Sequence, residues 1–205
     1  DAGGNQKHQV GYAPNTFYLF QQVYDKEGNP IQNAIVDRNG DGKITEDDRY
    51  LTGKSPMAKV YMGLSSQFTY KNWDLGFNMR ASLGNYVYNG NLSGNATSYN
   101  YGGQGILSNL YNGYQITGWN GRSIPEQGST DYFLEDASYL KMDNLTLGYS
   151  FSNFTKAKLS GRISASMQNV FTVSKYRGMD PECGAVDGTM WLRPRTYTIG
   201  LNLNF

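Results

Sequence analysis

The sequence predicts an all-β fold, an antiparallel transmembrane β-barrel of which this chain supplies about six final strands. Apolar and polar residues alternate with period two in several segments, as in strands that have one apolar and one polar face. The turns between these segments are alternately short and long, and an aromatic residue, Phe205, ends the last alternating segment. Short periplasmic turns and long extracellular loops are typical of barrels of the bacterial outer membrane.

The composition agrees with strands and argues against several other classes. The chain of 205 residues contains 17 Tyr and 25 Gly, which favours strands and turns over helices. No segment approaches the roughly 18 consecutive apolar residues of a membrane-spanning helix, and the mean hydropathy is -0.58. A net charge of +1 without a dense Lys/Arg run excludes a nucleic-acid partner. The single cysteine, Cys183, cannot form an internal disulfide, and we expect any signal peptide to lie upstream.

The clearest predicted hairpin covers residues 60 to 83. Lys71 and Asn72 form its turn, and the apolar face continues from one limb to the other. This face comprises Val60, Met62, Leu64, Phe68, Tyr70, Trp73, Leu75, Phe77, Met79, Ala81 and Leu83.

A second predicted hairpin joins the run that ends Leu145, Leu147, Tyr149, Phe151 to a run from Leu159 to Met167, through a turn at 152 to 158. The terminal strand, within 195 to 205, alternates apolar Tyr197, Ile199, Leu201, Leu203 and Phe205 with small polar residues. A further strand is expected at Thr16 to Tyr24, where the alternation is weaker.

The connection lengths orient these strands. Counting back from a periplasmic Phe205 places the long connections 26–57, 85–136 and 173–194 outside the cell, with lipid around the apolar face. One barrel domain therefore accounts for residues 1–205, with multiple passes through the outer membrane of a Gram-negative bacterium. An aromatic girdle at the periplasmic interface would comprise Phe68, Tyr70, Trp73, Tyr149, Phe151 and Phe205.

The terminal strand resembles the β-signal by which the barrel-assembly machinery recognises outer-membrane proteins. The positions that carry this resemblance are Thr198, Gly200, Leu203 and Phe205. An exposed strand edge can be captured by strand addition, which gives the signal its physical basis.

The segment DRNGDGKITEDD, residues 37 to 48, has the spacing of a calcium-binding loop. The expected ligands are the side chains of Asp37, Asn39 and Asp41, the carbonyl oxygen of Lys43 and the carboxylate of Asp48. Asp in the last position resembles the dockerin variant of the loop. The alternative is an acidic Asn/Gly turn without a metal.

The connection from residue 85 to about 128 is rich in aromatic residues, Asn, Gly and Ser. Its aromatic residues are Tyr86, Tyr88, Tyr99, Tyr101, Tyr111, Tyr114 and Trp119. Such residues suit sugar recognition, but they equally suit a loop that packs on itself, and substrate-binding residues cannot be chosen from the sequence.

Two other classes compete with the barrel. A soluble or surface-exposed carbohydrate-binding β-sandwich module that contains a calcium loop would show the same alternation of apolar and polar residues. A glycosidase would need paired carboxylates, and Glu135 and Asp136 are better explained as a solvated strand edge, so we expect no enzyme activity.

Several segments in order resemble the carboxyl-terminal region of the SusC/RagA family of TonB-dependent transporters of Bacteroidetes. They are DRNGDGKITEDDRYLTGKSP, YKNWDLGF, EDASYLKMDNLTLGYSF, QNVFTVSKYRGMDPE and the terminal strand. The resemblance implies a barrel of about 22 strands with a plugged lumen. It also implies import of glycans, or of peptides, driven by TonB with ExbB and ExbD, beneath a SusD-like surface lipoprotein. The plug and the TonB-contacting parts are not in this sequence.

Overall fold

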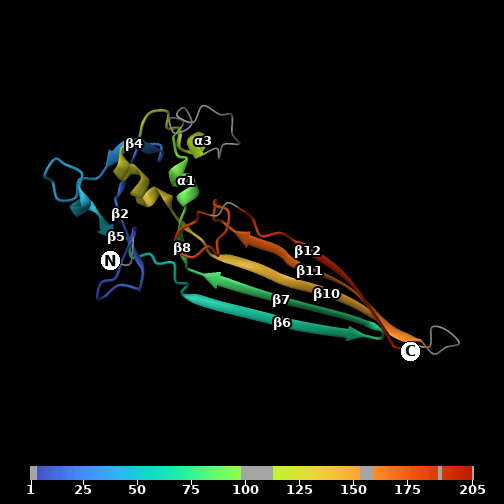
Figure 1. The fold of residues 1–205 in the computed structure, drawn as a ribbon. Helices are drawn as coiled ribbons and strands as arrows, with labels where there is room; N and C mark the ends of the chain where they lie inside the picture. Colours follow the sequence, from blue (N-terminus) through green and yellow to red (C-terminus); the bar gives the residue numbers. More distant parts are fainter. Residues whose placement is uncertain (1–3, 98–112, 153–158, 189–190, 205) are drawn as a thin grey trace. The chain divides into compact units, whose positions relative to one another are not determined.

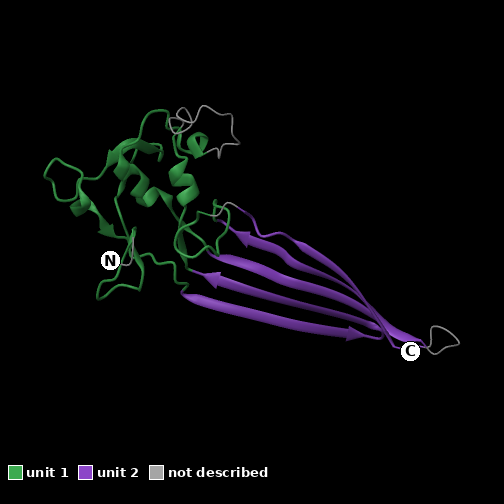
Figure 2. Cartoon of the chain, viewed as in Figure 1, with its two compact units in different colours: residues 1–58, 84–137, 176–190 green, residues 59–83, 138–175, 191–205 purple. Residues whose placement is uncertain are grey.

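The computed structural model describes residues 4–97, 113–152, 159–188 and 191–204 (Figure 1). The chain forms two compact units, each assembled from three segments (Figure 2). Unit 1 comprises residues 1–58, 84–137 and 176–190, and unit 2 comprises residues 59–83, 138–175 and 191–205. None of the described helices has the length and apolar character needed to cross a bilayer.

Unit 2 is one antiparallel sheet of five long strands, in the order β12-β11-β10-β7-β6. The strands are β6 (Val60–Tyr70), β7 (Trp73–Leu83), β10 (Tyr139–Phe151), β11 (Ser160–Ser174) and β12 (Thr196–Asn204). Both predicted hairpins and the terminal strand are confirmed. Lys71 has a φ of 53° in the turn between β6 and β7, so Tyr70 lies opposite Trp73. The middle of the second turn, 153–158, lies outside the described residues.

A β-bulge interrupts β10 at Asp143. The register shifts between Met142 and Asn144 against both neighbouring strands. Met142 remains opposite Met79 of β7, and Leu145 remains opposite Phe77. The bulge therefore absorbs one residue, and the apolar side chains on either side of it stay on the same face.

The single strand expected at Thr16 to Tyr24 is wrong. The segment divides into β2 (Thr16–Leu19), which pairs with β1 (Gln6–Lys7) and β5 (Tyr50–Leu51), and β3 (Gln22–Tyr24), which pairs with β4 (Pro30–Ile35). Phe17 and Leu19, on one face of β2, are fully buried, and on the other face Thr16 is fully buried while Tyr18 is half-buried. This explains the weak alternation, and the segment belongs to unit 1 instead of the long sheet.

The long predicted connections contain a packed core of their own. Short elements surround it, namely β8 (Tyr86–Tyr88), β9 (Leu134–Asp136), α1 (Gly90–Gly94), α3 (Gly113–Thr117), η1 (Glu46–Asp48), η2 (Pro125–Ser129) and η3 (Asp131–Phe133). The buried cluster comprises Phe17, Leu19, Tyr88, Leu92, Ala96, Trp119, Phe133 and Leu134. Aromatic edges meet aromatic faces in it: the Phe133 ring is nearly perpendicular to that of Trp119, at 6.1 Å between centroids. Unit 1 is thus a folded body.

Candidate functional site

One face of the five-stranded sheet is apolar in every strand, and most of its side chains are exposed or half-buried. Register brings Leu75, Leu147, Ala165 and Ile199 into one row across four strands. Leu147 is 43% exposed and Ile199 is 84% exposed. A β-sandwich buries this face against a second sheet, so the exposure argues against the sandwich alternative. The face requires an apolar environment.

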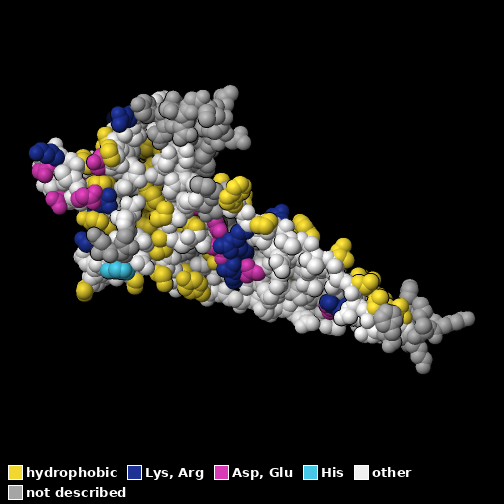
Figure 3. Space-filling model, viewed as in Figure 1, with side chains coloured by type: hydrophobic (Ala, Val, Ile, Leu, Met, Phe, Trp, Pro, Cys, Tyr) yellow, Lys and Arg dark blue, Asp and Glu magenta, His cyan; other side chains and the backbone are white. Residues whose placement is uncertain are grey.

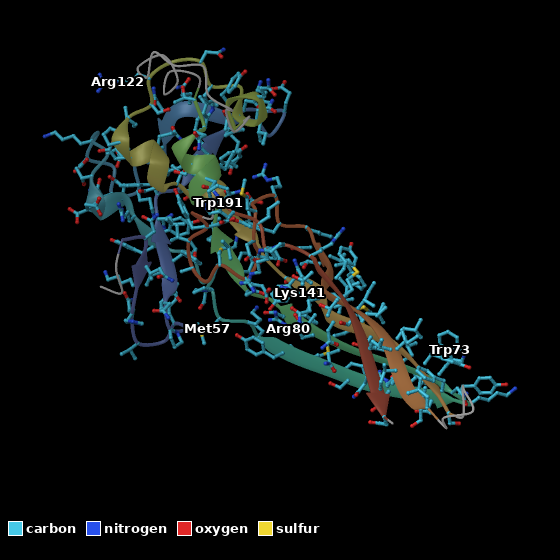
Figure 4. The ribbon with its side chains drawn as sticks, turned by 45° about the vertical axis from the view of Figure 1, so that its right-hand side comes forward. Met57, Trp73, Arg80, Arg122, Lys141 and Trp191 are labelled. Atoms are coloured by element: carbon cyan, nitrogen blue, oxygen red, sulfur yellow. The ribbon has the colours of Figure 1, made fainter. Side chains whose placement is uncertain are left out.

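Aromatic residues of this face gather at the end where β6 turns into β7. Trp73 lies opposite both Tyr70 and Tyr149, and its ring is 4.8 Å from that of Tyr149 (Figure 4). Tyr70 is 70% exposed. Phe205 lies outside the described residues. The predicted girdle residues on neighbouring strands therefore lie side by side, and their location at a membrane interface remains a prediction.

The opposite face is polar, and its arginines are paired with carboxylates. The Arg80 guanidinium donates from Nε to Asp143 Oδ2 at 2.7 Å and from Nη2 to Oδ1 at 3.1 Å. The bulge at Asp143 supplies this partner. Lys141, the register neighbour of Arg80, is almost fully buried (Figure 4).

A second ion pair crosses a whole strand on the same face. Arg162 of β11 donates to Asp74 of β7 from Nε at 3.0 Å and from Nη2 at 2.5 Å. The intervening residue of β10 is Gly148, and a Cβ there would lie 2.3 Å from Arg162 Nη2. The absence of a side chain at Gly148 is therefore what lets the pair form. In Figure 3 basic and acidic side chains meet at two places on the sheet surface.

The predicted calcium loop is a network of side-chain-to-backbone hydrogen bonds. Asp37 accepts from Gly40 N at 2.7 Å and from Gly42 N at 2.8 Å, and Asp41 accepts from Lys43 N at 2.8 Å. Asn39 Nδ2 donates to Asp41 Oδ2 at 3.2 Å.

Asp48 is fully buried and closes this loop. Its Oδ1 accepts from Arg38 N and its Oδ2 from Thr45 N, each at 2.8 Å. The Thr45 N–H, together with those of Arg38 and Asn39, holds the pKa of the Asp48 carboxyl below its ordinary value. Within the described ranges, no three His, Cys, Asp or Glu side chains are close enough to hold a metal. The loop thus brings together Asp37, Asn39 and Asp41, and the Asp48 carboxylate holds the loop closed by accepting hydrogen bonds from both of its ends.

Of the predicted assembly-signal residues, Thr198, Gly200 and Leu203 lie on β12, at one edge of the sheet, and Phe205 lies outside the described residues. Thr198 lies opposite Ser166, Gly200 opposite Ser164 and Leu203 opposite Gly161. A Cβ at Gly200 would be 2.8 Å from Ser164 Oγ, so a larger residue would crowd the neighbouring strand. Within the described part of the chain, β12 pairs only on its β11 side.

Where it is described, the aromatic connection packs into the core of unit 1, against residues from other segments. Tyr88 and Trp119 are buried in the core of unit 1, and Trp119 Nε1 donates to Pro30 O at 2.9 Å. Tyr99, Tyr101 and Tyr111 lie outside the described residues.

The carboxylate of Glu135 and the thiol of Cys183 are chemically reactive groups, but their contacts in the structure are structural. Glu135 accepts from Asn89 Nδ2 and from Arg177 Nε, so its carboxylate has two partners. Burial, with the nearby charges of Asp187 and Asp180, raises the pKa of the Cys183 thiol to about 12. A neutral thiol is a poor nucleophile.

No family model matches the chain. The TonB-dependent receptor SusC of Bacteroides thetaiotaomicron is 45% identical over 98% of this chain and 20% of its own length. The TonB-dependent receptor P3 of Formosa agariphila is 26% identical over 87% of this chain and 19% of its own length. The chain thus spans about a fifth of the curated relatives that it matches. They are receptors and not enzymes.

Two solved structures have the same fold over 99% of the chain. The RagAB peptide transporter superposes with a TM-score of 0.68 at 22% identity, covering 25% of that chain. The RagAB peptide importer in its open-open state gives a TM-score of 0.64 at 20% identity, covering 24% of that chain. The fold of unit 1 and the fold of unit 2 therefore both occur in one chain of the RagAB structures.

Proposed function

From the premise that this chain belongs to the SusC/RagA family of TonB-dependent receptors, we propose that it forms part of the wall and outer loops of an outer-membrane nutrient importer. One observation carries the proposal: the apolar face of the sheet is exposed across all five strands. Lipid provides the apolar surroundings that this face lacks, and the polar face then lines the lumen.

The proposed activity is import of glycans or peptides. A SusD-like surface lipoprotein covers the extracellular side, and TonB with ExbB and ExbD supplies the energy. The free edge of β12, with Thr198, Gly200 and Leu203, is proposed to be recognised by the barrel-assembly machinery, since an unpaired strand edge accepts another strand.

A matched pair of arginine substitutions tests the lipid-facing assignment. Leu147→Arg puts a charge on the apolar face, and Thr146→Arg puts the same charge on the polar face of the same strand. A charge on the lipid face costs about 2–4 kcal/mol near the membrane midplane, whereas the polar face tolerates it. We expect Leu147→Arg alone to reduce the amount of folded protein in isolated outer membranes.

Two results would contradict the assignment of the apolar face to lipid. Equal levels of the two variants, or release of the wild-type protein by salt without detergent, would mean that the apolar face does not contact lipid.

We also propose that calcium binds the loop from Asp37 to Asp48 and fixes it. The loop holds Asp37 and Asp41 at the first and fifth positions, and Asp48 Oδ2 accepts one N–H, which leaves that oxygen a lone pair. Calcium titration of the purified protein should show binding that Asp41→Ala weakens. Asp47→Ala, outside the ligand positions, is the control. If the protein binds no calcium at millimolar calcium concentration, the proposal is refuted.

A further inference from the structure

Unit 2 carries an excess of positive charge. Its sequence contains ten Lys and Arg residues but only two acidic residues, Asp74 and Asp143. These two carboxylates are already paired with Arg162 and Arg80. Unit 1 has the opposite balance, with eight basic and fifteen acidic residues. The acidic residues of the sheet unit therefore cannot neutralise its other eight basic residues.

Three of these basic residues lie at one end of the sheet. Lys59 directly precedes β6, Lys175 directly follows β11 and Arg195 directly precedes β12. Because neighbouring strands are antiparallel, these positions belong to the same end, opposite the turn at Lys71. All three side chains are exposed, and none of them forms an ion pair with a described residue. We call Lys59, Lys175 and Arg195 the basic rim.

The strand lengths place the basic rim at the edge of the apolar face. β6 has eleven residues and β12 has nine, close to the roughly 9–11 residues of a strand that crosses a bilayer. Among the described residues, the apolar face of these two strands contains no charged side chain. The first charged residue beyond it is Lys59 on β6 and Arg195 on β12. Since the proposed function places the apolar face against lipid tails, the basic rim lies at the level of the lipid headgroups.

Trp191 begins the segment that leads into β12, and it adds an aromatic residue beside the basic rim. Its side chain is 85% exposed, and it lies at the opposite end of the sheet from Trp73 (Figure 4). Trp side chains favour the boundary between lipid tails and water. The backbone of this segment is fixed beside β11, because Asn169 Nδ2 donates to Arg193 O at 2.8 Å. Trp191 and Arg195 are thus presented by a segment that is attached to the sheet.

We infer that the basic rim binds the phosphate groups of an anionic lipid whose acyl chains lie on the apolar face of the sheet. An Arg guanidinium can bind two phosphate oxygens at once, and each Lys adds a positive charge. A phosphate attached to acyl chains suits both neighbouring surfaces, whereas free phosphate leaves the apolar side chains exposed. The inference rests on the proposed function, which places this end of the sheet at the extracellular side. The ligand is therefore a phosphorylated lipid of the outer leaflet.

Phosphorylated lipid A and the same lipid A stripped of its phosphates are a matched pair of probes. Their binding to the complete purified transporter in detergent is measured by native mass spectrometry, and inorganic phosphate is added to separate samples as a competitor. Arg195→Gln removes one charge of the basic rim, and Arg195→Lys keeps that charge. Lys26→Gln, which removes an exposed charge of unit 1, is the control.

We expect the wild-type protein to bind phosphorylated lipid A more tightly than the dephosphorylated form, and high salt to reduce this preference. Arg195→Gln should weaken the binding of phosphorylated lipid A about fivefold, the usual contribution of one basic residue beside an anionic membrane surface. Arg195→Lys and Lys26→Gln should bind phosphorylated lipid A nearly as the wild type does. Binding of the dephosphorylated form should be the same in all of these proteins.

Three results would overturn the inference. They are equal binding of the two forms of lipid A, equal effects of Arg195→Gln and Lys26→Gln, and displacement of the lipid by inorganic phosphate at the same concentration. The last result would mean that the basic rim is a site for free phosphate. Failure of the proposed function is distinct, because neither form of lipid A would then bind, and Leu147→Arg and Thr146→Arg would be equally abundant in the outer membrane.

Discussion

Replacing Gly148 by Ala should break the Asp74–Arg162 ion pair without altering either partner. The new Cβ would lie 2.3 Å from Arg162 Nη2 and 2.4 Å from Asp74 Oδ1. Ordinary contact begins at 3.4 Å, so the guanidinium must retreat by about 1.1 Å. The Nη2–Oδ2 and Nε–Oδ1 bonds of 2.5 and 3.0 Å both depend on the guanidinium lying over this glycine, and such a retreat takes both out of hydrogen-bonding range.

Thermal unfolding of the complete protein in detergent, followed by gel mobility, measures the effect. Gly76→Ala is the control, because its Cβ would have no neighbour nearer than 3.8 Å. Gly148→Ala should lower the unfolding midpoint in the wild type but have little further effect in an Asp74→Asn background, where the ion pair is already lost. An equal loss in both backgrounds would show that the alanine acts through backbone strain and would refute the reasoning.

Two further predictions concern unit 1. Phe133→Ala removes a fully buried ring and should destabilise unit 1 by about 3–5 kcal/mol, read from hydrogen exchange of residues 84–97; unchanged exchange would contradict the core assignment. Asp48 has a lowered folded pKa, so its stabilising contribution is present above the unfolded value of 3.8 and is lost as pH falls through the lower folded value. Amide protection of residues 37–48 should therefore be constant above that range and decline below it, and Asp48→Asn should lack the decline. If the Asp48→Asn variant is equally acid-sensitive, the Asp48 carboxylate does not hold the loop closed.

The strands of unit 2 could be predicted because the sheet has one apolar and one polar face. Period two in Val60–Leu83 and in Tyr197–Leu203 follows directly from this difference. Thr16–Tyr24 misled the prediction because it divides into two short strands of different sheets, and three of the four residues of the first are fully buried, so alternation is weak there.

The ion pair between Asp74 and Arg162 on the polar face could be found only from the pairing of the strands in the structure. Asp74 and Arg162 are 88 residues apart, and neither has a local pattern that identifies its partner. Gly148 looked like any small strand residue, although its missing side chain decides the pairing.

The bulge at Asp143 interrupts the alternation of β10 but provides the carboxylate that binds Arg80. Deleting that one residue would make the hydropathy of Leu140 to Leu145 fully regular, because Met142 and Leu145 would then be two residues apart. It would also remove both hydrogen bonds from Arg80 to the Asp143 carboxylate. Deletion of Asp143 is thus expected to keep the apolar face of β10 continuous while weakening the ion pairing on its polar face.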